Sequence, residues 1–112
     1  MTSYPPHYRY TREHEWLRMD DSAGLDCTVG ITDHAQKALG DIVYLELPKV
    51  GDRFEARQPL GTVESVKAVS EIYSPVACEV LDVNAEVAAS PELLNQDPHG
   101  RAWLLKVRLT NP

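Results

Sequence analysis

Short β-prone stretches, separated by turn signals about every ten residues, constrain the fold of this chain more than any other feature. The clearest is the last, in which Trp103, Leu105, Val107 and Leu109 alternate with polar side chains. An alternation with a period of two places the apolar side chains on one face of a half-buried strand. Similar patterns predict strands over residues 12–19, 27–31, 42–47, 60–65, 69–73 and 78–83.

Many short antiparallel strands predict a mainly β fold, either a sandwich or a flattened barrel. In the strand at 42–47, the alternation predicts Val43, Leu45 and Leu47 on one face. Two short helices interrupt the strands, one capped by Thr32 and ended by Gly40, the other capped by Ser90 and reaching Leu94. Residues 1–7 are expected to be a loose lead-in, and residues 20–24 a polar turn.

The length of 112 residues predicts one small domain, residues 1–112, with its core over about 8–109. We expect a monomer. The formal charge of −6 and the pI near 5.1 argue against nucleic acid or an anionic membrane as a partner, because both require a basic face. Partners with basic docking surfaces fit this charge better.

The cysteines and histidines give no sign of a metal site or a disulfide framework. Cys27 and Cys78 are too few for a secreted disulfide scaffold, and no Cys-x-x-Cys or Cys/His ligand spacing occurs. We interpret both as packed side chains in a reducing compartment. The sequence also lacks an apolar run of membrane-spanning length and a signal-peptide pattern, so the cytoplasm is the expected location.

Lys67 is the candidate functional residue because it lies between two β-prone stretches that are too short for helices. A tight turn of Val66, Lys67 and Ala68 would hold its ammonium out in water, with no acid adjacent in sequence. Such an amine is open to an acylating enzyme. From spacing alone, an ordinary solvated turn lysine is the commoner outcome.

The residues around Lys67 resemble the lipoyl-lysine signature of the glycine cleavage system H protein family. The matching stretches are Glu64-Ser-Val-Lys-Ala68 and Ser70-Glu-Ile-Tyr-Ser-Pro-Val76. Further blocks resemble the family in the same order, among them His14-Glu-Trp16, Val29-Gly-Ile-Thr-Asp-His-Ala-Gln36, Leu39-Gly-Asp-Ile-Val43, Pro91-Glu-Leu-Leu-Asn95 and Trp103-Leu104. Together they extend from about Tyr8 to Leu109, nearly the whole chain.

The resemblance implies a lipoyl-domain-like barrel-sandwich hybrid of two antiparallel sheets with short flanking helices. It implies lipoate in amide linkage to Lys67 and a role in glycine catabolism and one-carbon metabolism, as a carrier and not a catalyst. The implied partners are the PLP-dependent glycine decarboxylase (P protein), the aminomethyltransferase (T protein), dihydrolipoyl dehydrogenase (L protein) and a lipoate-attaching enzyme. The carrier would shuttle the aminomethyl group of glycine from the first to the second.

The resemblance also implies a sheltering cleft for the loaded arm. By position, Glu15 and Glu71 would lie near the protonated amine of the cargo, and Ile31 and Leu39 would line the apolar side. Glu64 would help the lipoate-attaching enzyme recognise the hairpin. The alternatives are solvated surface charges for Glu15, Glu71 and Glu64, and core positions for Ile31 and Leu39.

Two features depart from the family pattern. Cys78 stands where members usually carry Gly, so a turn that needs a positive φ would be altered there. The chain ends at Pro112, where the family usually continues into a helix. The alternatives are therefore an H-like lipoyl carrier or lipoate relay for another pathway, an unmodified interaction paralog, and a biotin carrier. The last is disfavoured because Val66 and Ala68, and not methionines, flank the lysine.

Overall fold

The computed structural model describes residues 8–20 and 25–110. Within them, six strands form sheet A: β1 (Arg9–Tyr10), β2 (Glu15–Met19), β3 (Asp26–Ile31), β5 (Arg53–Phe54), β8 (Cys78–Val83) and β9 (Leu105–Leu109). Their order is β1-β2-β3-β9-β8-β5, with antiparallel pairing throughout. Sheet B contains β4 (Ile42–Glu46), β6 (Pro59–Ser65) and β7 (Val69–Tyr73), antiparallel in the order β4-β6-β7.

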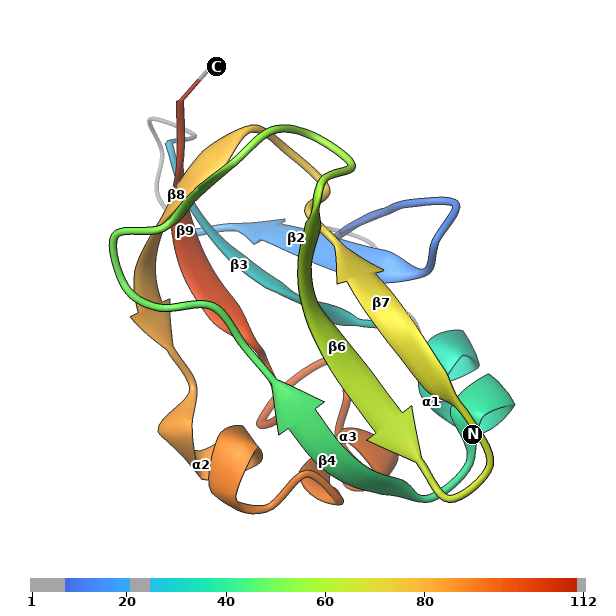
Figure 1. Ribbon diagram of the computed structural model, residues 1–112. Helices are drawn as coiled ribbons and strands as arrows, with labels where there is room; N and C mark the ends of the chain where they lie inside the picture. The colour runs from blue at the N-terminus through green and yellow to red at the C-terminus, as the bar shows by residue number, and fades with distance from the viewer. Residues whose placement is uncertain (1–7, 21–24, 111–112) are drawn as a thin grey trace.

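The two sheets lie face to face, and Figure 1 looks onto sheet B with sheet A behind it. Three short helices in the described residues lie towards one end of the sandwich: α1 (Asp33–Leu39), α2 (Ala85–Ala89) and α3 (Leu93–Gln96). The β6–β7 hairpin projects at the same end, with its tip beside α1. The predicted mainly β architecture of two antiparallel sheets with short flanking helices is confirmed.

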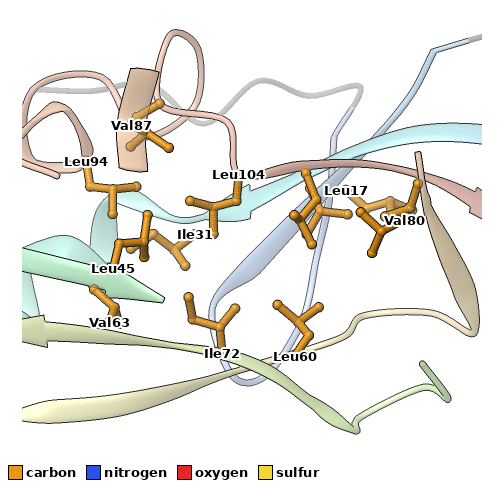
Figure 2. Close-up of a cluster of buried hydrophobic side chains, with 14 of the residues drawn as sticks. Leu17, Ile31, Leu45, Leu60, Val63, Ile72, Val80, Val87, Leu94 and Leu104 are labelled. Atoms are coloured by element: carbon orange, nitrogen blue, oxygen red, sulfur yellow. The ribbon is translucent and has the colours of Figure 1, made fainter. Parts of the chain in front are cut away.

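Apolar side chains from the inner faces of both sheets pack together as the core. Figure 2 labels members from both sheets, from α2 and α3 and from the segment before β9: Leu17, Ile31, Leu45, Leu60, Val63, Ile72, Val80, Val87, Leu94 and Leu104. All of them are less than a tenth exposed. Burial of one such side chain stabilises the fold by about 1.5–3 kcal/mol. Because β6 and β7 contribute three of these side chains, the hairpin is anchored in the core.

Local sequence signals correctly predicted the elements beside the hairpin. The predicted strand at 60–65 begins one residue earlier, and that at 69–73 has the predicted bounds. Helix α1 is capped as expected, because the Thr32 hydroxyl accepts a hydrogen bond from the Ala35 N–H at 3.2 Å. Gly40 ends the helix with φ 81°, and its N–H donates to the Gln36 carbonyl at 3.0 Å.

The first predicted strand is wrong at its start, because a turn occupies residues 12–14. His14 has φ 66°, and its N–H donates to the Thr11 carbonyl at 3.1 Å. This turn folds β1 back onto β2 in a short hairpin, with Tyr10 opposite Trp16. The predicted turn at residues 20–24 lies outside the described residues except for Asp20, and the predicted lead-in at residues 1–7 lies wholly outside them.

The predicted facing of β4 is also wrong. Ile42 and Leu45 are buried, whereas Val43 is 51% exposed. The register against β6 shifts between Ile42 and Tyr44, so a bulge breaks the simple alternation. Val43 therefore joins Tyr44 at the surface.

The second predicted helix is displaced along the chain. Ser90 ends α2 and is not the cap of α3, which begins at Leu93 and has Glu92 at its N-cap position. Helix α2 itself was not predicted, although Asn84 caps it by accepting a hydrogen bond from the Glu86 N–H at 3.1 Å.

The inward position predicted for Trp103 is filled by Leu104, which is fully buried. Trp103 precedes β9 and is partly exposed, with the Lys106 ammonium 4.9 Å from its ring centroid. The alternation holds only from Leu105 onward, because the regular ladder begins there. Trp103 thus makes a cation–π contact at the surface and does not occupy the predicted core position.

Neither cysteine forms a disulfide, and both are buried, as predicted. Cys78 lies within regular β8, opposite Leu109 and Phe54, and has no positive φ. Position 78 is therefore not a turn that needs the positive φ of a glycine, and the expected alteration of such a turn does not arise. Burial raises the pKa of the Cys78 thiol, which lies 3.5 Å from the Ser74 hydroxyl.

Candidate functional site

The turn between β6 and β7 is fixed by hydrogen bonds that centre on Ser65. Its N–H donates to the Ala68 carbonyl at 2.8 Å, and its hydroxyl oxygen accepts from the N–H groups of Ala68 at 3.1 Å and Lys67 at 3.3 Å. The Val66 N–H donates to the Asp41 carbonyl at 3.0 Å, which ties the tip to the segment before β4. The backbone that carries Lys67 is thus held firmly.

The side chain of Lys67 extends from this turn into solvent. It is exposed, and none of the ion pairs among residues 8–20 and 25–110 includes its ammonium. Its stem passes the end of α1, with Cε 3.6 Å from the point where a Cβ on Gly40 would lie. A methyl group at this helix end would make only an ordinary van der Waals contact with the stem. The predicted exposure of Lys67 is confirmed.

Two of the other lysines differ from Lys67 because their ammonium groups are engaged. The Lys37 ammonium lies 3.0 Å from the Asp33 carboxylate, one helical turn away. Lys106 lies over the ring of Trp103 and 3.4 Å from the Thr28 hydroxyl. An acylating enzyme that needs a free, rigidly presented amine would find it at Lys67.

Strand β7 leads from Lys67 to a group of acids at its far end. With five residues at about 3.4 Å each, the strand spans about 17 Å. Glu71 is exposed on its outer face. The charge of Glu71 and a hydrogen bond to its carboxylate raise the pKa of Tyr73, and burial and the charges of Glu13 and Glu15 act in the same direction. Three acids, Glu13, Glu15 and Glu71, therefore lie near the Tyr73 side chain.

Glu15 is a buried carboxylate and not the solvated surface charge of the alternative interpretation. It is only 2% exposed. One oxygen accepts a hydrogen bond from the Thr11 hydroxyl at 2.7 Å, and the other lies 3.5 Å from the Tyr73 N–H that donates to it. Burial raises the pKa of Glu15, although these hydrogen bonds oppose the rise. The residue bridges the start of β2 and the end of β7.

The remaining candidates divide between core and surface. Ile31, opposite Glu15 on β3, is 3% exposed and belongs to the core cluster. Leu39 is partly buried at the end of α1 and packs against that cluster. Glu64 is exposed on β6, opposite Tyr44 and Val69. The structure thus places the six candidates in three settings: tip and outer face, strand end, and core.

A hollow at the Tyr73 end was not indicated by the sequence. It has a volume of about 250 Å³ and is lined by Glu13, Arg57 and Tyr73. Arg57 is held there with φ 69°, and its N–H donates to the Ser74 carbonyl at 2.7 Å. The loop before β2 and the loop before β6 meet only in the folded chain, so no local pattern could have paired these residues.

Two kinds of feature are absent from the described ranges. No group of three or more His, Cys, Asp or Glu side chains among residues 8–20 and 25–110 is arranged to hold a metal ion. None of the helices in this part of the chain has the length and apolar character needed to cross a membrane.

A sequence model of the family described as Glycine cleavage H-protein matches residues 8–112, which include the whole hairpin and the Tyr73 end. The chain belongs to the glycine cleavage H-protein family. Members of this family are the lipoyl carriers of the glycine cleavage system, and this role is the one that the exposed lysine on a fixed turn suits.

Individual relatives agree with this family assignment. The glycine cleavage system H protein of Herpetosiphon aurantiacus is 54% identical over 110 residues, which are 98% of this chain and 83% of the relative. That of Rubrobacter xylanophilus is also 54% identical over 110 residues, 98% of this chain and 85% of the relative. Each of these two relatives is similar to nearly the entire length of this chain.

A solved structure extends the likeness to three dimensions. The crystal structure of a glycine cleavage system H protein from Mycobacterium marinum matches with a TM-score of 0.89 at 36% identity. The match covers 96% of this chain and 87% of that one. The predicted lipoyl-domain-like barrel-sandwich fold is therefore confirmed.

Proposed function

We propose that Lys67 is the lipoyl attachment site and that this chain shuttles the aminomethyl group of glycine from the decarboxylase to the aminomethyltransferase. The observation that carries the proposal is the exposed, unpaired amine of Lys67 on a turn fixed by Ser65. Within the family, that amine is the group that an attaching enzyme would acylate. Dihydrolipoyl dehydrogenase completes the set of partners.

The residues around Lys67 fit a lipoyl group. The exposed outer side of β7 leads from the Lys67 turn towards the hollow at Tyr73. When bound, lipoate supplies a redox-active dithiolane at the end of a flexible arm. The chain itself supplies position, because the tip is fixed by hydrogen bonds while the side chain is not. It thus acts as a carrier and not as a catalyst.

The acids along β7 have a role in sheltering the cargo. Glu71 and Glu15 would stabilise a protonated amine by charge-assisted hydrogen bonds, Glu71 from the outer face and Glu15 from the end of the strand. Ile31 and Leu39 would limit the access of water by filling the apolar layer beneath. Glu64 would contribute to recognition by the attaching enzyme. We also propose a cytoplasmic location. The buried Cys27 and Cys78 form no disulfide, which agrees with it.

Replacement of Lys67 by Arg tests this function. Arg keeps the positive charge but lacks the amine that forms the amide, so glycine-dependent CO2 exchange with the decarboxylase should fall to background. Because a side chain at a hairpin tip buries little surface, the free energy of unfolding should change by less than about 0.5 kcal/mol. Lys49→Arg, at another exposed turn, is the control and should retain full exchange.

Three outcomes separate the alternatives. Exchange by Lys67→Arg at the wild-type rate would contradict the attachment site. A lipoylated wild-type chain that supports no exchange would point to an H-like carrier or lipoate relay of another pathway. A chain that the attaching enzyme leaves unmodified would point to an interaction paralog.

A further inference from the structure

Exposed apolar side chains gather at the hairpin end of the molecule. Eight large apolar side chains in the described ranges are exposed, and four of them lie on or beside the hairpin: Val43, Tyr44, Val66 and Val69. Their exposed fractions range from 51% to 71%. An apolar patch of this kind on a folded chain commonly marks an interaction site. Val66 and Val69 lie close to Lys67 in sequence, and Val43 and Tyr44 lie on β4 beside the hairpin.

The strand register shows how the patch continues over the outer face of sheet B. Tyr44, Glu64 and Val69 lie opposite one another across β4, β6 and β7, and form one row. The next row contains Glu46, Thr62 and Glu71. We call the six side chains of these two rows the hairpin face. Figure 1 looks onto the strands that carry it.

The charge of the hairpin face has one sign. The strands of sheet B carry Glu46, Glu64 and Glu71 and no Lys or Arg. None of the ion pairs among residues 8–20 and 25–110 includes these three carboxylates. Glu64 lies diagonally opposite both of the others, where like charges repel. Glu71 accepts a hydrogen bond from the Tyr73 hydroxyl, whereas the fold gives no such reason to place Glu46 and Glu64 there.

Acylation of Lys67 makes the imbalance larger. The lysine is the only cation in the segment from β6 to β7, and an amide bond removes its charge. The lipoylated carrier therefore presents Tyr44 and Val69 on either side of Glu64, with Glu46 and Glu71 in the next row. The complementary surface carries apolar side chains together with Lys or Arg.

Resting on the proposed function, we infer that the hairpin face is the docking surface for the glycine decarboxylase, which binds it through apolar contacts together with basic side chains. Tyr44 and Val69 provide the apolar contacts. Glu64 between them and Glu46 in the next row attract the basic side chains and speed the encounter. The decarboxylase is the partner to test because glycine–CO2 exchange requires only that enzyme and the carrier.

Two matched pairs of variants test the surface on carriers shown by intact mass to be fully lipoylated. Glu46→Gln with Glu64→Gln removes two charges from the hairpin face, and Glu55→Gln with Glu92→Gln removes two exposed charges elsewhere. Val69→Ser removes an apolar side chain that is 67% exposed, and Val50→Ser removes one that is 63% exposed on a distant turn. Melting temperatures check that all four remain folded.

The hairpin-face variants should raise the KM of the decarboxylase for the carrier and leave kcat unchanged. We expect a rise of at least about threefold for the double glutamine variant, within the range that electrostatic steering supplies. For this variant, kcat/KM should also depend less steeply on ionic strength. Val69→Ser should raise KM, and both controls should match the wild type. Direct binding of the decarboxylase to each immobilised carrier provides a second readout.

The outcomes distinguish this inference from the proposed function. Exchange-competent hairpin-face variants with the same KM and salt dependence as the controls would overturn the docking surface alone. So would variants that slow only lipoyl attachment, because the surface would then serve the attaching enzyme. Salt-dependent binding without exchange would support the docking surface and contradict the proposed function. Loss of both binding and exchange in the wild type would overturn both.

Discussion

The outer faces of the two sheets differ in whether their charged side chains form ion pairs. On sheet A, Asp26, Arg108, Glu79 and Arg53 lie opposite one another across β3, β9, β8 and β5, with alternating sign. Asp26 and Arg108 approach to 2.9 Å, and Arg53 and Glu79 to 3.5 Å. On sheet B, the carboxylates have no such partners. The charges of this row of sheet A are paired within the fold, whereas Glu46, Glu64 and Glu71 have no ion-pair partner among the described residues.

The same contrast holds for the aromatic side chains of the two faces. Trp16 on sheet A is fully buried, and its indole N–H donates to the Pro98 carbonyl at 2.8 Å. Tyr44 on sheet B is 53% exposed. The loop that contains Pro98 covers one aromatic, and no described segment covers the other. Substitutions on sheet A should therefore cost stability, and substitutions on the outer face of sheet B should cost function.

Trp16→Ala should have the largest effect on stability. Removal of a fully buried aromatic side chain costs about 3–5 kcal/mol, a large part of the stability of a small domain. Val69→Ser on the opposite face should change the free energy of unfolding by less than about 0.5 kcal/mol. Urea denaturation of both variants gives the comparison. Equal losses would contradict the division between the two faces.

Local sequence predicts much of the structure of the hairpin, but it does not predict several features that depend on contacts between distant segments. Turn chemistry and β-propensity over residues 60–73 were enough to place Lys67 at an exposed tip, and Thr32 and Gly40 were enough to bound α1. The burial of Glu15 was not predictable, because it depends on contact between β2 and β7. Likewise the bulge at Val43 arises from the register of β4 against β6, which adjacent residues do not determine.

Gly40→Ala should have an intermediate effect. Gly40 has φ 81° and ψ −150°, a conformation that costs a residue with a side chain about 1–3 kcal/mol. Gly51→Ala is the matched control, because Gly51 has φ 94° but no atom within 4 Å of the added methyl group. Both should lose stability. Acylation of Lys67 should be unchanged in both variants, since a methyl group 3.6 Å from the Lys67 Cε makes only an ordinary van der Waals contact. Slower acylation of Gly40→Ala alone would contradict the described path of the lysine stem.

Glu15→Gln should change how stability depends on pH. Burial raises the folded-state pKa of Glu15 above its ordinary value of 4.5. The contribution of Glu15 to stability is therefore fully present below about pH 4.5 and is lost as the pH rises through the folded-state pKa. The stability of the variant relative to the wild type should rise across that window. Parallel stability curves for the two proteins would show that the carboxylate is not buried as described.

The smallest effects should come from single charges on the two outer faces. A hydrogen bond from Arg108 lowers the pKa of Asp26, so its contribution to stability is present above the ordinary value of 3.8 and is lost as the pH falls through the folded-state pKa. Asp26→Asn should lower the melting temperature at neutral pH but not in strong acid. Glu64→Gln should not lower it at either pH. A fall for Glu64→Gln would indicate that sheet B also uses its charge for stability.

The most direct measurement is the intact mass of the chain from lipoate-supplied cells, with peptide mapping of any modification. The chain has four lysines, at positions 37, 49, 67 and 106. We expect one lipoyl increment, located on Lys67 alone. An unmodified chain, or an increment on another lysine, would contradict the assignment of the hairpin as the site of attachment.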